Sequence, residues 1–261
     1  MSIVLYHHPF SRAATVVWML EEVGVEHELR FVNIMAGEQK SPAIVALNPM
    51  GKLPILTDGD AVVTESAAIG LYLADRYAPG RLAPALDDPA RGTYLRWSLF
   101  APSVIEPGAM AKAASWAFKP GQAGWGDYTA MLGAMTAAIG KGPFLLGDTF
   151  SMADVIFSGT LRYMLSFGML EPRAEFTRYA ERLAARPALQ RADARNAAIR
   201  DAHGLNVPGR CPRASESHDD DLVAGQPDSS PVVRVARVQA SNHAHLRDPR
   251  RLRRPSLRFR R

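Results

Sequence analysis

The stretch Asn48–Ile69, NPMGKLPILTDGDAVVTESAAI, decides the fold of this chain. Its middle predicts two short strands, Pro54–Leu56 and Ala61–Thr64. Asp58-Gly59 lies between them and is typical of a tight hairpin, because a two-residue connection needs a positive φ that Gly supplies and Asp tolerates. The stretch therefore predicts an antiparallel strand pair at the centre of the first part of the chain.

Two residues of the same stretch stand where the backbone has special chemistry. Pro54 opens the first strand, a position where the missing N–H of proline is tolerated. Ser66 follows Glu65 and opens an apolar helical run, Ala67–Tyr77. Free backbone N–H groups and the helix dipole favour an anion at such a helix start. We therefore expect a helix after the hairpin, with an anion site at its beginning.

Before this stretch the chain alternates strands and helices. Ile3–Tyr6 predicts a strand, and apolar residues from Ala13 to Gly24 are spaced for one face of a helix. Glu28–Val32 predicts a second strand. Ser41 and Pro42 begin a short helix, with Ser41 as a capping residue and Pro42 at the first helical position. The order β-α-β-α-β-β-α over the first 77 residues predicts a small sheet flanked by helices.

After Tyr77 the strand patterns stop. We expect a first domain over residues 1–78, a linker rich in Pro and Gly over 79–88, and an all-helical domain over 89–202. Pro107-Gly108 is expected to break or bend the first long helix of that second domain. The helices predicted there cover residues 91–105, 127–139, 151 to about 165, 176–184 and 187 to about 198.

A capping box is predicted at Ser151. Its side chain can cap a helix while Asp154, three residues later, bonds back to the start of the helix. Phe150 and Val155 fit the apolar pair that often flanks such a box. This motif supports the fold, and we assign it no chemistry.

Composition limits the class of protein. The chain has 261 residues, 47% hydrophobic, and one cysteine, Cys211, which excludes an internal disulfide and a Cys-x-x-Cys pair. The single cysteine also excludes a cysteine metal cluster. No apolar run is long enough to cross a bilayer, and the first residues do not resemble a secretory signal. We expect a cytoplasmic protein with a real hydrophobic core.

The net charge of +5 belongs to the end of the chain. From His203 onward there are 12 Arg, no Lys and 6 acidic residues, so this segment carries +6 and the rest carries −1. We expect residues 203–261 to be disordered, because they lack periodicity. An arm that binds nucleic acid or a membrane surface is one alternative, and a shifted reading frame is another. For the folded body we predict neither a nucleic acid nor a membrane as partner.

Two motifs resemble one family. Gly51–Pro54 and Glu65–Ile69 resemble the thioredoxin-like half of the glutathione transferases, although Leu53 stands where that family usually has Val. Gly142–Val155 resembles the segment that opens the core helix of their second domain. The resemblance covers residues 1 to about 200. It implies an α/β thioredoxin-like N-terminal domain followed by an all-α C-terminal domain, with glutathione as co-substrate and no metal.

The resemblance also implies roles in binding glutathione. Pro54 is expected to be cis, and the backbone of Leu53 is expected to meet the cysteinyl part. Glu65 and Ser66 are expected to hold the γ-glutamyl end. For the glycyl carboxylate the resemblance leaves Lys40 and Lys52 as alternatives. The predicted binding residues are Lys52, Leu53, Pro54, Glu65 and Ser66.

The predicted chemistry is activation of a thiol. A thiol with a pKa of about 8.5 is mostly protonated at neutral pH, whereas the thiolate is the nucleophile. Serine-type transferases place a Ser five residues after a strand-end Tyr, and Ser11 follows Tyr6 at that spacing. We predict Ser11 as the catalytic residue, with Tyr6 or a loop backbone N–H as alternatives. We expect His7 and His8 to be solvated loop residues.

The second substrate is expected to be a hydrophobic electrophile bound between the two domains. A pocket is predicted from Phe10, Met110, Trp116 and Phe118, although core packing explains these side chains equally well. The reaction stays open among conjugation, dehalogenation, ether cleavage and peroxide reduction. The resemblance implies a homodimer with no assigned interface. The alternative function is a non-catalytic binding or interaction protein on the same fold.

Overall fold

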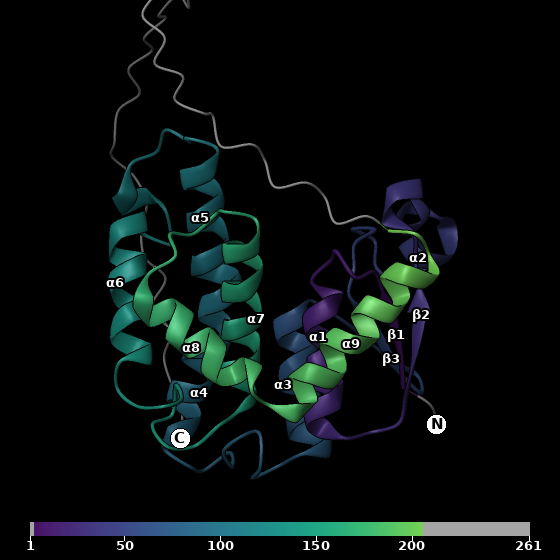
Figure 1. Ribbon diagram of the computed structural model, residues 1–261, viewed down its shortest axis with the longest axis horizontal. Coiled ribbons are helices and arrows are strands. Elements are labelled where there is room, and N and C mark those ends of the chain that lie inside the picture. Colours follow the sequence, from purple (N-terminus) through teal and green to yellow (C-terminus); the bar gives the residue numbers. More distant parts are fainter. Residues whose placement is uncertain (1–2, 206–261) are drawn as a thin grey trace, which may run out of the picture. The chain divides into compact units, whose positions relative to one another are not determined.

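The computed structural model describes residues 3–205 (Figure 1). In this part of the chain four strands form one sheet in the order β2-β1-β3-β4. β1 (Ile3–His7) pairs in parallel with β2 (His27–Phe31) and antiparallel with β3 (Ile55–Asp58). β4 (Ala61–Thr64) pairs antiparallel with β3. Apart from residues 203–205, the predicted disordered tail lies outside the described residues.

The helices of the first half follow the predicted order. α1 (Ala13–Val23) connects β1 to β2, α2 (Pro42–Leu47) precedes β3, and α3 (Ser66–Tyr77) follows β4. Two 3₁₀ turns, Ile34–Ala36 and Glu38–Lys40, precede α2. The order β-α-β-α-β-β-α is therefore confirmed, and with it the thioredoxin-like α/β half.

Three details of this half differ from the prediction. The residues that connect β3 to β4 are Gly59 and Asp60, one position later than expected, and only Gly59 has a positive φ, of 60°. Asp58 stays in the strand, where its buried carboxylate accepts hydrogen bonds from the hydroxyls of Tyr72, at 2.7 Å, and Tyr77 of α3. Asp58 therefore ties the hairpin to α3. The side chain of Ser41 makes no capping bond to α2.

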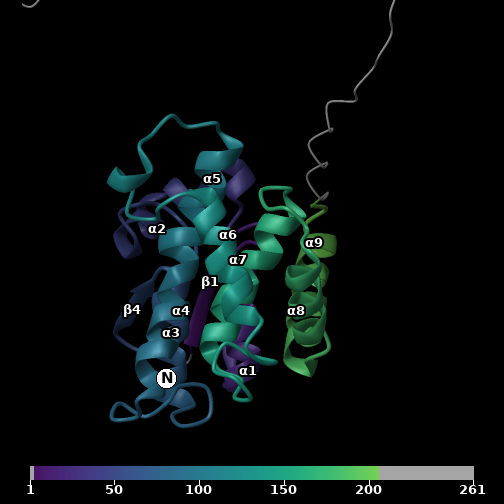
Figure 2. The same cartoon turned by 90° about the vertical axis from the view of Figure 1, so that its left-hand side faces the viewer.

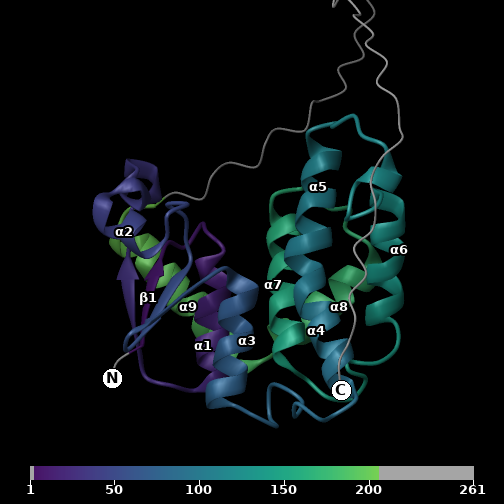
Figure 3. The ribbon, with the colours of Figure 1, turned by 180° about the vertical axis from the view of Figure 1, so that it is seen from behind.

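The second half contains helices, as predicted, and Figures 2 and 3 show α5 beside both α6 and α7. Isolated bridges apart, no strand lies between residues 79 and 205. Its elements are α4 (Ala90–Phe100), a π-helix (Ala101–Ile105), α5 (Glu106–Ala113), a 3₁₀ turn (Pro120–Gln122), α6 (Tyr128–Ile139), α7 (Met152–Ser166), α8 (Ala174–Ala184) and α9 (Pro187–Ala202).

Pro107-Gly108 was predicted to break or bend the helix, and it does not break it. The helical path continues from α4 through the π-helix into α5, and Pro107 stands in the first turn of α5. Pro107 has no N–H to donate, so the ladder of helical hydrogen bonds lacks one bond at this position, directly after the π-helix. The irregularity in the path lies earlier, in the π-helix, whose first turn contains Pro102.

The capping box at Ser151 is confirmed. The carboxylate of Asp154 accepts from the backbone N–H of Ser151 at 2.9 Å and from that of Leu145 at 2.8 Å. It also accepts from the hydroxyl of Tyr179 in α8, at 2.7 Å. Asp154 therefore joins the start of α7 to the preceding loop and to α8.

One hydrophobic core runs through both halves, and α1 lies at its centre. Buried side chains of this core come from β1, α1 and α3 as well as from α4 to α9. α9 lies alongside α1 (Figure 1), where Glu21 accepts from Arg191 and Arg195, and the buried Glu22 accepts from Arg186. α7 crosses α1 so closely that a Cβ on Gly159 overlaps Cγ2 of Thr15 and lies 2.7 Å from its Oγ1.

This crossing generates a stability prediction. Gly159→Ala is expected to destabilise the protein by about 1–3 kcal/mol, because Thr15 is β-branched and cannot move away without repacking. The matched control is Gly92→Ala in α4, where nothing lies within 4 Å of the added Cβ. That change should stabilise by about 0.5–1 kcal/mol through helix propensity. Chemical denaturation measures both, and equal effects of the two substitutions would contradict the close crossing.

Candidate functional site

The register of the sheet places three segments that contain predicted site residues at the same end of the sheet. Tyr6 pairs with Ile55, and Ile55 pairs with Thr64, so these three residues form one row across the sheet. β1 leaves this row toward Ser11, β3 enters it from Leu53 and Pro54, and β4 leaves it toward Glu65 and Ser66. The loop before α1, the loop before β3 and the start of α3 therefore lie together.

The first segment is a tight turn that leads into α1. The backbone N–H of Ser11 donates to the carbonyl of His8 at 3.0 Å, and the Ser11 hydroxyl donates to the same carbonyl at 2.9 Å. The Ser11 Oγ in turn accepts from the N–H of Ala13 at 3.1 Å. Backbone N–H groups of residues 10, 11, 13 and 14 are thus engaged, whereas that of Arg12 has no acceptor among the described residues.

Arg12 connects this turn to the helical half. Its guanidinium donates to both carboxylate oxygens of Glu106, at 2.9 and 3.1 Å, and stacks on the ring of Tyr163 at 3.6 Å. Glu106 is the first residue of α5, and Tyr163 belongs to α7. A bidentate, partly buried pair is more specific in geometry than an exposed one. No local sequence pattern predicts this contact, because 94 positions separate Arg12 from Glu106.

The second segment is the loop that ends at Pro54. The Leu53-Pro54 peptide is cis, as expected. Buried Asn48 shapes the loop: its amide donates to the carbonyl of Lys52 at 2.9 Å and its Oδ1 accepts from the N–H of Met50 at 3.1 Å. Neither peptide group of Leu53 has a partner among the described residues. An extended ligand can therefore pair with Leu53 as a further strand would.

Two lysines flank this loop. Lys52 is exposed, whereas the ammonium of Lys40 donates to the carbonyl of Met50 at 2.8 Å. Lys52 adjoins Leu53 in the chain, and the contact with Met50 places the ammonium of Lys40 at the same loop.

The third segment is the start of α3. Glu65 precedes the helix with φ 65° and ψ 121°, a conformation that costs a non-glycine residue on the order of 1–3 kcal/mol. Its exposed carboxylate makes no capping bond. Ser66 is the first helical residue and is half-buried. The strained residue thus stands beside the free N–H groups of a helix start, which can bind a carboxylate.

Comparisons with known proteins agree with this arrangement. Residues 1–75 match the family model for the glutathione S-transferase N-terminal domain, and residues 121–191 match that for the C-terminal domain. Glutathione S-transferase 3 of Zea mays is 30% identical over 205 residues, which cover 72% of this chain and 91% of that protein. The chain belongs to the glutathione S-transferase family. It is an enzyme of that family.

Two further proteins support the same assignment. Glutathione S-transferase F10 of Arabidopsis thaliana is 29% identical over 178 residues, 63% of this chain and 82% of that protein. The crystal structure of the glutathione transferase URE2P6 from Phanerochaete chrysosporium, in complex with oxidized glutathione, aligns with a TM-score of 0.64 at 26% identity. That alignment covers 76% of this chain and 97% of the other. The transferase fold therefore extends over both halves.

Tyr6, the alternative to Ser11, lies on the other side of the sheet from α1. Its ring packs beside Val32, Ile44 and Ile55, and its hydroxyl accepts from Arg30 at 3.1 Å. Ser11 instead lies at the start of α1. The side chains of Tyr6 and Ser11 therefore lie in different places in this transferase, and they are not alternative donors at one position.

Two of the four residues predicted for the electrophile pocket line one cavity. Trp116 and Phe118 line a cavity of about 260 Å³ between α5 and α6, without Phe10 or Met110. Met110 lies one turn after Glu106, on the α5 face that meets Arg12. The cavity uses the opposite face of α5, and its full lining is Gly108, Ala111, Lys112, Ser115, Trp116, Phe118, Trp125 and Tyr128.

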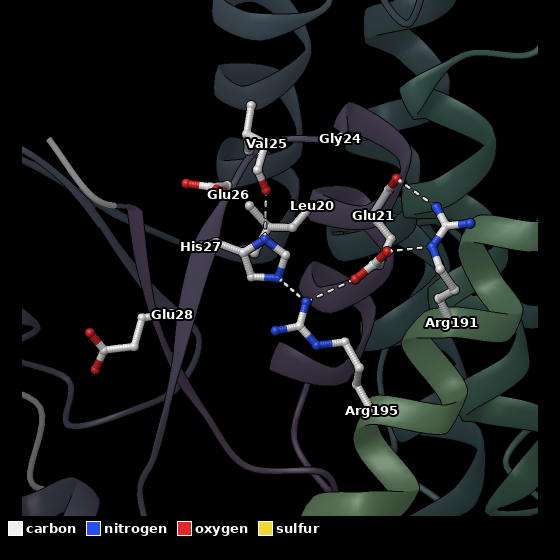
Figure 4. A pocket seen from close by; sticks show the side chains of 9 residues that line it. All are labelled: Leu20, Glu21, Gly24, Val25, Glu26, His27, Glu28, Arg191 and Arg195. Atoms are coloured by element: carbon white, nitrogen blue, oxygen red, sulfur yellow. Dashed lines mark hydrogen bonds and ion pairs between the residues drawn. The ribbon is translucent and has the colours of Figure 1, made fainter.

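The larger of these two cavities, about 770 Å³, is lined by residues from Leu20 to Glu28 together with Arg191 and Arg195 (Figure 4). Since α1 ends at Val23, this cavity lies at the end of α1 away from Ser11. Glu21 there is paired with Arg191 and Arg195, and Arg195 also contacts Nε2 of His27 at 2.6 Å. Glu21 thus pairs with both guanidinium groups that line this cavity. Among residues 3–205, no group of three His, Cys, Asp or Glu side chains is placed to hold a metal ion, and no helix is long and apolar enough to cross a membrane.

The expectation that His7 and His8 are solvated is wrong, because both side chains are completely buried. Nε2 of His7 bonds to Oδ1 of Asn196 in α9 at 2.7 Å, and Asn196 also donates to the carbonyl of Ala14 at 3.4 Å. Burial lowers the pKa of His7 to about 4, although the bond to Asn196 acts in the opposite direction. His7 is therefore a neutral residue of the core.

This burial predicts acid sensitivity. The ordinary pKa of His7 is 6.5, so at lower pH the unfolded chain binds a proton that the folded protein excludes. Stability is complete above pH 6.5 and falls as the pH approaches about 4, by up to about 3 kcal/mol from His7. His7→Gln keeps a donor for Asn196 without a titrating group, so it should reduce the dependence of the unfolding free energy on pH in this range. Unfolding measured from pH 7 to 4 tests this, and an unchanged slope would contradict it.

Proposed function

We propose that this chain is a cytoplasmic glutathione transferase that activates the glutathione thiol at the start of α1 for attack on a hydrophobic electrophile. The observation that carries the proposal is the meeting of three groups at one sheet end. These are the Ser11 turn, the free peptide of Leu53 and the start of α3. Together they supply donors for a thiolate, an edge for a peptide and a site for a carboxylate.

Ser11 is the proposed catalytic residue. Its Oγ accepts from Ala13 N–H in the first turn of α1, which polarises the hydroxyl and makes it a better donor. With glutathione bound, the hydroxyl turns its hydrogen from the carbonyl of His8 to the sulfur. The unengaged N–H of Arg12 supplies a second donor. Hydrogen bonds to the charged form favour the thiolate over the thiol, so the pKa of the bound thiol falls.

The rest of glutathione is held by the other two segments. Leu53 pairs its backbone with the cysteinyl part, in front of Pro54. Ser66 and the exposed Glu65 hold the γ-glutamyl end, with its carboxylate at the free N–H groups of α3 and its ammonium beside Glu65. Lys52 or Lys40 pairs with the glycyl carboxylate.

The electrophile approaches from the side of the helical half. Phe10 lies in the turn, directly before Ser11, and Met110 lies on the α5 face that carries Glu106, so these two are the proposed apolar contacts nearest to the sulfur. Trp116 and Phe118 belong to the α5–α6 cavity and are assigned no contact with the electrophile. The competing function, a non-catalytic binding protein, is favoured if glutathione binds without turnover of any electrophile.

A pair of substitutions separates activation from binding. Ser11→Ala is expected to raise the pKa of bound glutathione and lower kcat at neutral pH, with part of the loss recovered at higher pH. Ser66→Ala should instead raise the KM for glutathione, about ten- to a hundredfold, with a smaller change in kcat, because that contact is the same in ground and transition states. Thiolate absorbance against pH measures the first effect, and steady-state kinetics the second.

Two outcomes reassign the donor. If Tyr6→Phe moves the thiolate profile and Ser11→Ala does not, the phenol is the activating group. If neither moves it, the backbone N–H of Arg12 is the remaining donor in the turn.

We also propose a homodimer, on the strength of family membership. Exposed apolar side chains, Met50, Val62 and Leu99 among them, are available for burial between subunits. Sedimentation equilibrium should give twice the monomer mass, and a monomer at all concentrations would refute the assembly.

A further inference from the structure

His8 is engaged with the Ser11 turn at two points. Its ring Nδ1 accepts from the backbone N–H of Phe10 at 3.1 Å. Its carbonyl oxygen accepts from both the N–H and the hydroxyl of Ser11, at 3.0 and 2.9 Å. One residue therefore fixes the two positions that follow Pro9. This is the task that Asn, Asp or Ser usually performs at the first position of a turn.

The contact to Phe10 defines the proton on the ring. An Nδ1 that accepts from an N–H carries no hydrogen, so the neutral ring is protonated on Nε2. Nε2 is buried and has no partner among the described residues. Burial lowers the pKa of His8, and His203 adds to the effect. The ring is therefore neutral at physiological pH and keeps its Nδ1 lone pair for the turn.

Aromatic packing holds the ring in place. The His8 ring lies 5.6 Å from that of Phe10 and 5.5 Å from that of Phe31, at the end of β2. Phe31 stacks on His203, just after α9, with centroids 3.7 Å apart and planes 12° from parallel. The orientation of Nδ1 is thus set by β2 and by the end of α9, and solvent plays no part in it.

We propose that His8 is a positioning residue for thiol activation. Its Nδ1 and its carbonyl oxygen hold the turn in the shape that presents the Ser11 hydroxyl and the Arg12 N–H at the start of α1. This inference rests on the proposed function. Without the Nδ1 acceptor, the Phe10 N–H is released and the turn has other conformations available. The Ser11 hydroxyl then spends less time at the position of the sulfur, and misplacement of this kind is costly for a reacting group.

Two amides of different length test the Nδ1 atom. His8→Asn places an amide oxygen where Nδ1 was and restores the acceptor. His8→Gln places its amide near the former Nε2 and leaves the Nδ1 position without an acceptor. We expect His8→Gln to raise the pKa of bound glutathione and to lower kcat at neutral pH about tenfold, with recovery at higher pH. His8→Asn should stay within about twofold of the parent, and the glutathione KM should change less than kcat in both.

The controls separate this inference from the function on which it rests. Ser11→Ala is measured alongside, and His8→Phe gives a second variant without the acceptor if His8→Gln does not fold. A raised thiol pKa in Ser11→Ala and in the acceptor-free variants, with rescue in His8→Asn, supports the proposal. If Ser11→Ala shifts the pKa but His8→Gln and His8→Asn behave alike, His8 has no positioning role. If Ser11→Ala shifts nothing, the Ser11 hydroxyl is not the activating donor, and this inference fails together with that assignment.

Discussion

The enclosure of α1 is the constraint on which the rest of the structure depends. α7 approaches it so closely at Thr15 that only glycine fits at position 159, and α9 covers another side through Asn196. These contacts come from segments more than 140 positions later in the chain. The Ser11 turn leads directly into α1. The packing of α7 and α9 on α1 therefore fixes the position of this turn relative to the sheet.

This dependence explains why the two halves share one core. In the α/β half, the strands and helices cover only part of one another's apolar surface. The helical half supplies the remaining cover, and in doing so it brings Glu106 and Tyr163 to Arg12. The groups that meet at the entry to α1 therefore come from both halves. Separating the two halves would expose core residues to water. It would also break the contacts of Arg12 with Glu106 and Tyr163.

Local patterns predicted most of the fold and, within the candidate site, the helix that begins at Ser66. Turn residues and periodicity are local, so they gave the order of strands and helices, the capping box at Ser151 and the motif at Pro54. The hairpin turn was misplaced by one residue because Asp is common both in turns and at strand ends. Pro107 was misjudged because proline both breaks helices and begins them. In both cases the residue type is compatible with more than one kind of position, and contacts with neighbouring residues decide which one it takes.

The rest of the site depends on contacts that no local pattern contains. The partners of Arg12 and His7 lie 94 and 189 positions away. Adjacent histidines before a proline have the composition of a solvated loop, yet α9 and the end of β2 bury both. Whether a polar residue is buried depends on the assembled fold. The sequence shows only that the residue is polar and is well solvated when it is exposed.

The electrostatics of the turn follow from the same long-range contact. A guanidinium next to Ser11 would by itself favour a nearby anion, but Glu106 takes two hydrogen bonds from Arg12 and compensates its charge. The pair therefore acts mainly as a brace between α1 and α5. For the thiolate that we propose at this turn, the favourable groups that remain are the positive end of the α1 dipole, equivalent to roughly half a charge, and the hydrogen-bond donors of the turn. Because hydrogen-bond donors act only at short range and at good angles, the shape of the turn matters more here than the sum of nearby charges.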